Sequence, residues 1–417
     1  MAQIQNKALQ LYQGHKQMNL YKNTHTNTKQ KGFSIVELMI AVFIGIIILT
    51  GLVQVFDTSS KMNRTQNGLA RIQENGRYAI SLMKQTIEQT GYQYCMGESN
   101  DPSLSTNQPT KFAWDIRSLP FIPGFAIGPF DPAFLLHGHE CGDSVCAPTM
   151  NSLGSNTAAL VPDIGTDDGD RMAGTDVLTF RYISGPGREV QSISGDTITF
   201  TPWEIANPPS VAVPNTGQVL VVNCDDSSPT LVSRTAAGSS TITVSPDPLQ
   251  NAHLAKVFDM QSDFSTITYY VANNVVDGRD IPTLFSNVNG VTNAIIEGVD
   301  AFDIIYGVMN NAGGITFLDA AGVQNFPIAN CWPAIKNING TSIANTAGCG
   351  WRSVVSAEVH MLLNTIYNST NNSNEQFKYS QYGNEFYDQS DLPSGIEHYS
   401  MHRKEFSTTI SLKNVMH

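Results

Sequence analysis

The sequence predicts an α+β fold in which one long N-terminal helix packs on a mostly antiparallel β-sheet with long loop insertions. Three observations support this fold class. One apolar run with an amphipathic continuation covers residues 33–90, segments of alternating polarity recur between residues 176 and 412, and stretches rich in Gly, Pro, Asn and Ser separate them. A long helix followed by a series of strands is typical of a sheet that covers the outer half of the helix.

Residues 33–56 are the only segment of the sequence that is long and apolar enough to span a bilayer. A helix rises about 1.5 Å per residue, so about 20 apolar residues cross the hydrocarbon core. Residues 1–32 contain five lysines and no acid, and the positive-inside rule therefore places them in the cytoplasm and the body of the chain across the membrane. A secretory signal peptide would have a shorter apolar core that ends in small residues, so we expect a single-pass anchor instead.

Residues 57–90 continue this helix with an apolar stripe along one face. The stripe consists of residues at spacings of three, four and seven, namely Leu69, Ile72, Ala79, Ile80, Met83 and Ile87. Gly91 is a natural end for the helix, because glycine readily adopts the left-handed conformation that follows a helical C-terminus. The helix also contains glycines that either let it bend or allow close packing, and we favour packing at Gly45, Gly51, Gly68 and Gly76.

Residues 91–417 are expected to form one β-rich globular domain. Alternating polarity predicts strands at residues 176–184, 197–201, 218–223, 240–244, 265–272, 300–308, 353–364 and 405–412. Three polar stretches rich in Gly, Asn and Ser are expected to be loop insertions, near residues 92–170, 309–350 and 366–400.

The charge of the chain argues against general binding to nucleic acid or to anionic lipid. The net charge is −12, and residues 33–417 are more acidic still because residues 1–32 contribute only lysines. Basic residues on the predicted stalk were weighed as a DNA contact, namely Lys61, Arg64, Arg71, Arg77 and Lys84. Acids interrupt them at Asp57, Glu74 and Glu88, so a solvated or inter-subunit role is favoured.

All six cysteines follow the apolar segment, which predicts disulfides in an oxidising compartment. Closeness in sequence favours the pairs Cys141–Cys146 and Cys331–Cys349. The pair Cys95–Cys224 then remains by elimination.

One acid interrupts the apolar run, and the residues around it resemble the prepilin leader signature. The signature covers Lys31-Gly32-Phe33-Ser34-Ile35-Val36-Glu37-Leu38. The resemblance implies that a membrane-embedded prepilin peptidase cuts between Gly32 and Phe33 and that Phe33 becomes N-methylated. An acid within a membrane segment needs a partner, and the new amine at Phe33 of a neighbouring subunit would neutralise Glu37. The leader is longer than most in the family, so both Met1 and Met18 stay open as the start.

Six short segments along the chain resemble the PilW group of minor pilins. In order they are Gly76-Arg77-Tyr78-Ala79-Ile80, Gly174-Thr175-Asp176-Val177-Leu178, Val221-Val222-Asn223-Cys224, Glu297-Gly298-Val299-Asp300, Ile305-Tyr306-Gly307-Val308 and Val354-Val355-Ser356-Ala357-Glu358-Val359. The resemblance implies a structural subunit of type IV pili, which serve adhesion and twitching motility, in a priming or tip complex. It would sit in the bacterial inner membrane with its body in the periplasm before it enters a filament.

The same resemblance implies partners and leaves alternatives open. The implied partners are the prepilin peptidase, other minor pilins, the major pilin, the inner-membrane assembly platform and a tip adhesin. One alternative is a J-type minor pseudopilin of type II secretion, to which the PilW group is similar. Another is a pilus-associated binding module for calcium, a surface ligand or DNA.

Catalytic and metal-binding patterns were sought, and none makes the chain an enzyme or implies a cofactor. Gly142-Asp143-Ser144 faintly resembles a serine-protease nucleophile, but it lies between two cysteines that we expect to pair. A zinc site was weighed at His137, His139, Cys141 and Cys146. An acidic turn offers a weak calcium candidate at Asp163, Asp167, Asp168 and Asp170, but its spacing is not that of an EF-hand. An aromatic cluster is interpreted as loop packing or a contact loop, at Tyr379, Tyr382, Phe386 and Tyr387.

Overall fold

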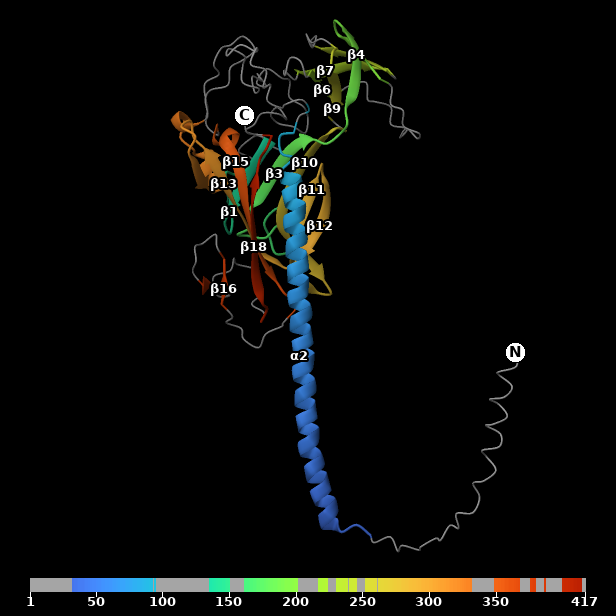
Figure 1. Cartoon of the computed structure of the whole chain (residues 1–417), viewed down its shortest axis with the longest axis vertical. Helices are drawn as coiled ribbons and strands as arrows, with labels where there is room; N and C mark the ends of the chain where they lie inside the picture. Colours follow the sequence, from blue (N-terminus) through green and yellow to red (C-terminus); the bar gives the residue numbers. More distant parts are fainter. Residues whose placement is uncertain are drawn as a thin grey trace, which may run out of the picture. The chain divides into compact units, whose positions relative to one another are not determined.

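The fold was analysed in a computed structural model that describes most of the chain after residue 31. The described residues are 32–92, 94, 135–150, 161–201, 217–223, 230–238, 240–245, 252–260, 262–331, 349–367, 376–379, 386–387 and 400–414. Two compact units, residues 1–60 and 61–417, divide the chain. The long helix α2, Ile35–Ile87, begins in the first unit and ends in the second (Figure 1).

The described part of the second unit contains two larger antiparallel sheets, a two-stranded sheet and a closed barrel. The first has the order β12-β11-β10-β3-β1-β2, and the second has the order β14-β13-β15-β18. The first comprises β1 Leu136–Cys141, β2 Cys146–Ala147, β3 Val177–Ile183, β10 Phe264–Val276, β11 Arg279–Val288 and β12 Val291–Glu297. The second comprises β13 Val299–Met309, β14 Ile315–Leu318, β15 Val354–Asn364 and β18 Arg403–Ser411.

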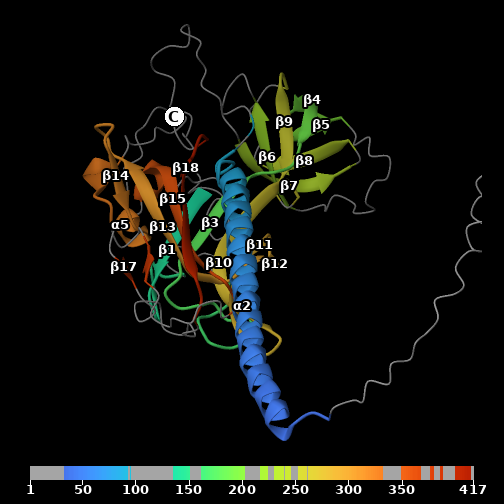
Figure 2. The ribbon, with the colours of Figure 1, turned by 60° about the horizontal axis from the view of Figure 1, so that its bottom comes forward.

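A closed barrel of six strands lies between β3 and β10 in the sequence (Figure 2). Its strands are β4 Arg188–Ser194, β5 Thr197–Phe200, β6 Gly217–Asn223, β7 Thr230–Ala237, β8 Thr241–Ser245 and β9 Ala255–Asp259. Alternating side chains of β5 and β8 point inward, so that Ile198, Phe200 and Ile242 belong to an apolar core of the barrel itself. Closure of the strands also removes exposed sheet edges.

The α+β class is confirmed, and each predicted strand is present with small shifts at its ends. The barrel was not predicted, because alternation gives the faces of a strand but not its pairing partners. The structure also has strands that the sequence pattern missed, among them β4, β7, β9, β11 and β12.

Parts of the stretches predicted as loop insertions form regular elements. The stretch 92–170 contains β1 and β2, and the stretch 309–350 contains β14, the helix α5 Ala320–Gln324 and two short 3₁₀ helices, η3 Ile328–Asn330 and the start of η4 Cys349–Ser353. The stretch 366–400 contains the paired strands β16 Phe377–Lys378 and β17 Phe386–Tyr387. β1 escaped detection because it buries polar side chains, His137 and His139, and therefore shows no alternation of polarity.

The second half of α2 packs on both sheets through the predicted stripe. Ile72, Ala79, Met83 and Ile87 are buried in the same core as residues of β3, β10, β13 and β15. The Thr86 hydroxyl also lies 2.8 Å from the Tyr269 hydroxyl on β10. The helix ends at Ile87, close to the predicted end, and a turn follows to Gly91, whose φ is +74°. The amphipathic pattern therefore located the buried face of the helix, while the predicted end at Thr90 lies three residues beyond the observed one.

Gly76 lets α2 lie close to β18. An ideal Cβ at Gly76 would come 2.5 Å from Cε2 of Phe406. The Phe406 ring therefore occupies the space that a side chain at residue 76 would need. Gly68 is similar, since its Cβ would lie 3.0 Å from Thr365 Cγ2, whereas Gly45 and Gly51 have nothing within 4 Å. The packing interpretation therefore holds for the two glycines of the second half.

We expect Gly76→Ala to lower the free energy of unfolding by about 1–3 kcal/mol through overpacking against Phe406. The direction of the change in unfolding free energy is informative, because at a solvent-exposed helix position alanine is favoured over glycine by up to about 1 kcal/mol. Chemical unfolding of the full chain in detergent measures the effect, with Gly51→Ala as the control that should not lose stability. An increase in stability for Gly76→Ala would contradict the close approach.

Gly298 carries the chain from the first sheet to the second. Its φ is +82°, its N–H donates to the Pro282 carbonyl at 2.7 Å, and its carbonyl accepts the Asn364 N–H at 2.8 Å. Two residues further, the buried Asp300 accepts from Asn364 Nδ2 at 2.6 Å and from Arg403 Nε at 2.7 Å. The segment Gly298–Asp300 thus joins β13 to β15 and β18.

We expect Arg403→Met to destabilise the chain by about 3–5 kcal/mol, because it leaves Asp300 as a buried charge without its cation. The side chains of Arg403 and Asp300 are 2% and 0% exposed. Burial raises the pKa of Asp300, while Arg403 and Asn364 act in the opposite direction. Denaturant unfolding tests this, and Asp300→Asn combined with Arg403→Met should recover most of the loss. Equal destabilisation of the single and double variants would contradict the explanation.

Two disulfides have the predicted pairing. Cys141–Cys146 closes the hairpin of β1 and β2, and Cys331–Cys349 joins the segment after η3 to η4. The third expected pair, Cys95–Cys224, lies outside the described residues. The Cys141–Cys146 disulfide leaves neither of these sulfurs as a thiolate ligand for zinc.

Candidate functional site

The expected processing site lies at the start of α2. Gly32, Phe33 and Ser34 precede the helix and are exposed. Ser34 caps the helix, since its carbonyl accepts the Leu38 N–H at 3.1 Å and its Oγ accepts the Val36 N–H at 3.3 Å. A cut between Gly32 and Phe33 would therefore leave α2 and its cap intact.

Glu37 lies in the first turn of α2, three residues after the capping Ser34. This spacing is that of a capping box, and the helix dipole also favours an acid at this end. Glu37 is exposed and has no charged partner among the described residues. The carboxylate is therefore accessible at the start of α2.

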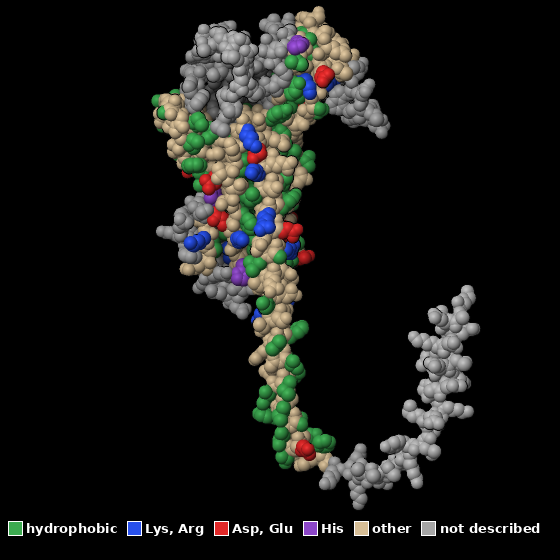
Figure 3. All heavy atoms as spheres, in the orientation of Figure 1, with side chains coloured by type: hydrophobic (Ala, Val, Ile, Leu, Met, Phe, Trp, Pro, Cys, Tyr) green, Lys and Arg blue, Asp and Glu red, His purple; other side chains and the backbone are tan. Residues whose placement is uncertain are grey.

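The first half of α2 is apolar on all sides. Every large apolar side chain from Phe33 to Phe56 is at least 50% exposed. The most apolar 18-residue window of α2 has a mean hydropathy of 2.7, and none of it is buried within the chain. Figure 3 shows these side chains along the helix. Exposed apolar surface of this extent requires lipid or neighbouring helices to cover it.

In the acidic turn that was weighed as a calcium candidate, carboxylates accept hydrogen bonds from backbone N–H groups. Asp170 Oδ2 accepts the Asp167 N–H at 3.0 Å, and Asp168 Oδ1 accepts the Val275 N–H at 2.9 Å. The loop is attached to β10 through these bonds and through Gly169 N–H, which donates to the Asn273 carbonyl at 2.8 Å. These contacts give the carboxylates of Asp168 and Asp170 a structural role.

The other weighed residues are also engaged in packing. His139 Nδ1 lies 2.7 Å from the Pro148 carbonyl, and burial lowers the pKa of His139 to about 4, so that the ring is neutral. Tyr379 is buried, and its hydroxyl donates to Asp303, so it is not a contact residue. The side chains of Tyr382, Phe386 and Tyr387 lie outside the described residues. The basic residues of the stalk, Lys61, Arg64, Arg71, Arg77 and Lys84, are all exposed.

A group of three carboxylates that the sequence did not predict, two of them buried and one half-buried, joins the two sheets. Glu140 of β1, Asp176 before β3 and Asp303 of β13 each place an oxygen within 4.8 Å of the other two. Asp176 connects the sheets, because its Oδ1 accepts the Cys141 N–H at 3.2 Å and its Oδ2 accepts the Ile304 N–H at 2.9 Å. We call these three residues the carboxylate cluster.

If all three carboxylates of the cluster were ionised, their negative charges would repel one another. Two unit charges at this separation repel by about 3 kcal/mol at an effective dielectric constant of about 20. Burial, then Asp303 and Asp319, raises the pKa of Glu140 to about 7. Burial, then Asp303 and Glu140, raises the pKa of Asp176 well above its usual value. The cluster therefore needs protons or a cation to balance it. Asp176 does belong to one of the quoted PilW-like segments, but nothing in the sequence links it to Glu140 and Asp303.

Two comparisons with known families bear on this structure. Residues 27–53 match the prokaryotic N-terminal methylation motif, and residues 268–414 match the family described as type IV pilus-assembly protein W. Searches of curated proteins and of solved structures each found no match. The second match includes three of the six quoted segments, those at Glu297, Ile305 and Val354.

The exposed apolar helix and the methylation motif at its start fit a pilin-type single-pass anchor and support a type IV pilin-like role. The C-terminal match supports, within this class, a PilW-type type IV minor pilin. Both matched families are structural components of pili rather than enzymes.

Proposed function

We propose that this chain is an assembly subunit of type IV pili that works in a priming or tip complex. Prepilin peptidase removes residues 1–32, and Phe33 becomes the N-methylated first residue. The subunit then stays in the bacterial inner membrane through residues 33–56, with residues 57–90 as the stalk and residues 91–417 in the periplasm. The observation that carries the proposal is the fully exposed apolar half of α2 with Glu37 in its first turn.

The proposed assembly contact pairs Glu37 with the amine of Phe33 on a neighbouring subunit. In a bundle of apolar helices the effective dielectric constant is low, so an unpaired carboxylate is costly and a paired one directs the register of the helices. Ser34 keeps the amine end fixed, because it caps α2 directly after Phe33. The N-terminal amine would then lie one residue before the capped end of α2, where we propose that a neighbouring Glu37 reaches it.

The folded body supports a specialised subunit rather than the bulk of a filament. It carries a closed barrel in addition to the two sheets, and its edge strands β12 and β14 expose apolar residues such as Val291, Ile315 and Phe317. Its partners would be other minor pilins, the major pilin and the inner-membrane assembly platform.

The test of this function is deletion of the gene, followed by counts of surface pili and by assay of exoprotein export in the same cells. We expect pili to be lost or rare while export continues, and complementation with the full chain should restore them. Cross-linking and capture of the processed subunit should enrich other minor pilins over the major pilin. Normal piliation with failed export would instead favour a J-type pseudopilin of type II secretion.

A further inference from the structure

We propose that the carboxylate cluster of Glu140, Asp176 and Asp303 binds one hard divalent cation, of which Ca²⁺ is the ion we expect. This goes beyond the proposed assembly function and concerns different residues from those of the acidic turn. The argument rests on the spacing of the carboxylate oxygens and on unpartnered oxygens beside them.

The spacing suits a cation with several oxygen ligands. Three carboxylates from three separate elements bring one oxygen each within 4.8 Å of the others. Oxygens that share a calcium ion lie about 2.3–2.6 Å from it, and so within about 5 Å of one another. Asp176 is held by the backbone N–H groups of Cys141 and Ile304, so its position is fixed from both sheets.

Buried oxygens without a hydrogen-bond partner lie at the cluster. Oε2 of Glu140 is buried, and it accepts no hydrogen bond from any described residue. The hydroxyl of Tyr306 is likewise unpartnered among the described residues, and Tyr306 is 0% exposed. A buried polar oxygen without a partner is uncommon in folded proteins and calls for a ligand.

Tyr306 points to the face of β1 that carries Glu140. An ideal Cβ at Gly138 would lie 1.8 Å from the Tyr306 hydroxyl oxygen, so that hydroxyl sits directly on this face. Residues 138 and 140 project from the same face of a strand, and the hydroxyl and the Glu140 carboxylate therefore share it. Consistent with this, the charges of Asp176 and Glu140 add to the effect of burial in raising the pKa of Tyr306.

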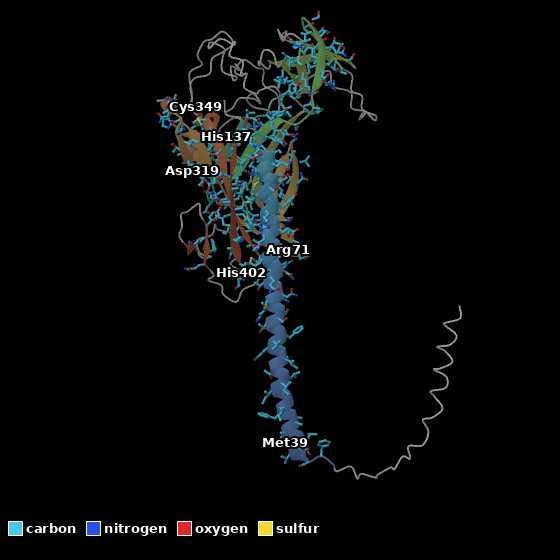
Figure 4. The ribbon with its side chains drawn as sticks, viewed as in Figure 1. Met39, Arg71, His137, Asp319, Cys349 and His402 are labelled. Carbon is cyan, nitrogen blue, oxygen red and sulfur yellow. A yellow bond between two sulfur atoms is a disulfide. The ribbon has the colours of Figure 1, made fainter. Side chains whose placement is uncertain are left out.

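The chemistry of the ligands selects the class of ion. Carboxylate and phenol oxygens are hard ligands, and the disulfide at Cys141–Cys146 takes the adjacent sulfur atoms out of consideration. Such oxygen sets suit calcium rather than zinc or copper. Asp319, labelled in Figure 4, acts on the cluster, since its charge adds to the effect of burial in raising the pKa of Glu140. Asp319 is occupied as the cap of α5, since its Oδ1 accepts the Gly322 N–H at 2.6 Å.

The test is a calcium titration of the full processed chain in detergent after treatment with a chelator. We expect one calcium ion per chain by equilibrium dialysis, and a rise of about 3–6 °C in the unfolding midpoint at a 100-fold excess over Kd. Glu140→Gln should weaken calcium binding at least about tenfold, because it removes a charged ligand. The same variant should unfold no more easily than wild type without calcium, since the neutral amide relieves the repulsion in the cluster.

The control is Asp167→Asn, which removes an exposed carboxylate of the acidic turn and should leave calcium binding unchanged. If Glu140→Gln does not fold, Tyr306→Phe takes its place in the test. This variant removes only a hydroxyl that is unpartnered among the described residues, and it should weaken calcium binding. The proposal is overturned if wild type shows no binding or stabilisation by calcium. It is also overturned if Glu140→Gln binds calcium as tightly as wild type, or if Tyr306→Phe does so where Glu140→Gln does not fold.

Discussion

Substitution of Gly32 by arginine should leave the chain at its precursor size. Gly32 has no side chain and stands directly before Phe33, and no atom of the described residues lies within 4 Å of an ideal Cβ at this position. The folded structure therefore has room for a side chain at residue 32. A substitution here should affect only cleavage by the peptidase. We expect Gly32→Arg to abolish processing while the body folds normally, which an immunoblot of membrane fractions measures directly.

The matched control places the same side chain two residues earlier. Gln30→Arg adds the same charge and bulk to the leader but keeps the junction between Gly32 and Phe33. We expect it to be processed as wild type. Processing of Gly32→Arg at the normal rate would remove the basis for assigning a prepilin-type leader.

Loss of the charge at Glu37 should uncouple processing from assembly. Glu37→Gln keeps the size and helix propensity of the side chain, but it leaves the Phe33 amine of a neighbouring subunit without a carboxylate in an apolar bundle. We expect normal cleavage, normal membrane insertion and a severe loss of cross-links to other pilins. The measurement compares the amount of processed chain with the yield of cross-linked complexes.

The control for Glu37 keeps the charge and shortens the side chain. Glu37→Asp should retain a substantial part of the cross-linking, because a carboxylate still lies in the first turn of α2. If Glu37→Gln assembled as well as wild type, then Glu37 would act only as part of the capping box with Ser34, which a neutral glutamine also completes.

The parts of the fold that depend on periodicity could be predicted from the sequence. The apolar stripe of α2 named Ile72, Ala79, Met83 and Ile87, and all four are buried. The prediction of β3, β10, β13 and β15 succeeded for the same reason, since their side chains alternate or form apolar runs. The two disulfides were predictable because their cysteines are close in sequence.

The parts that depend on pairing across long distances could not be predicted. β1 contains two histidines and a glutamate in six residues, yet it lies inside the first sheet between β3 and β2. The carboxylate cluster forms only because three segments lie side by side in the fold: β1, β13 and the residues just before β3. No local sequence pattern indicates that these segments are close in space. The closed barrel also depends on β4 pairing with β9, about 70 residues apart.

The candidate assembly site could be proposed from the sequence because its residues are close together in the chain. Gly32, Phe33, Ser34 and Glu37 fall within six residues, and the structure adds that Ser34 caps the helix. The function that we propose for these residues nevertheless depends on an amine that proteolysis would create, and the unprocessed chain does not contain that charge.

Mass spectrometry of the protein purified from membranes or pili tests the central claim most directly. Our account predicts an N-terminal peptide that begins at Phe33 and carries a methyl group on its amine, with no peptide from residues 1–32 attached. A mature chain that begins at any other residue, or that retains the leader, would contradict it.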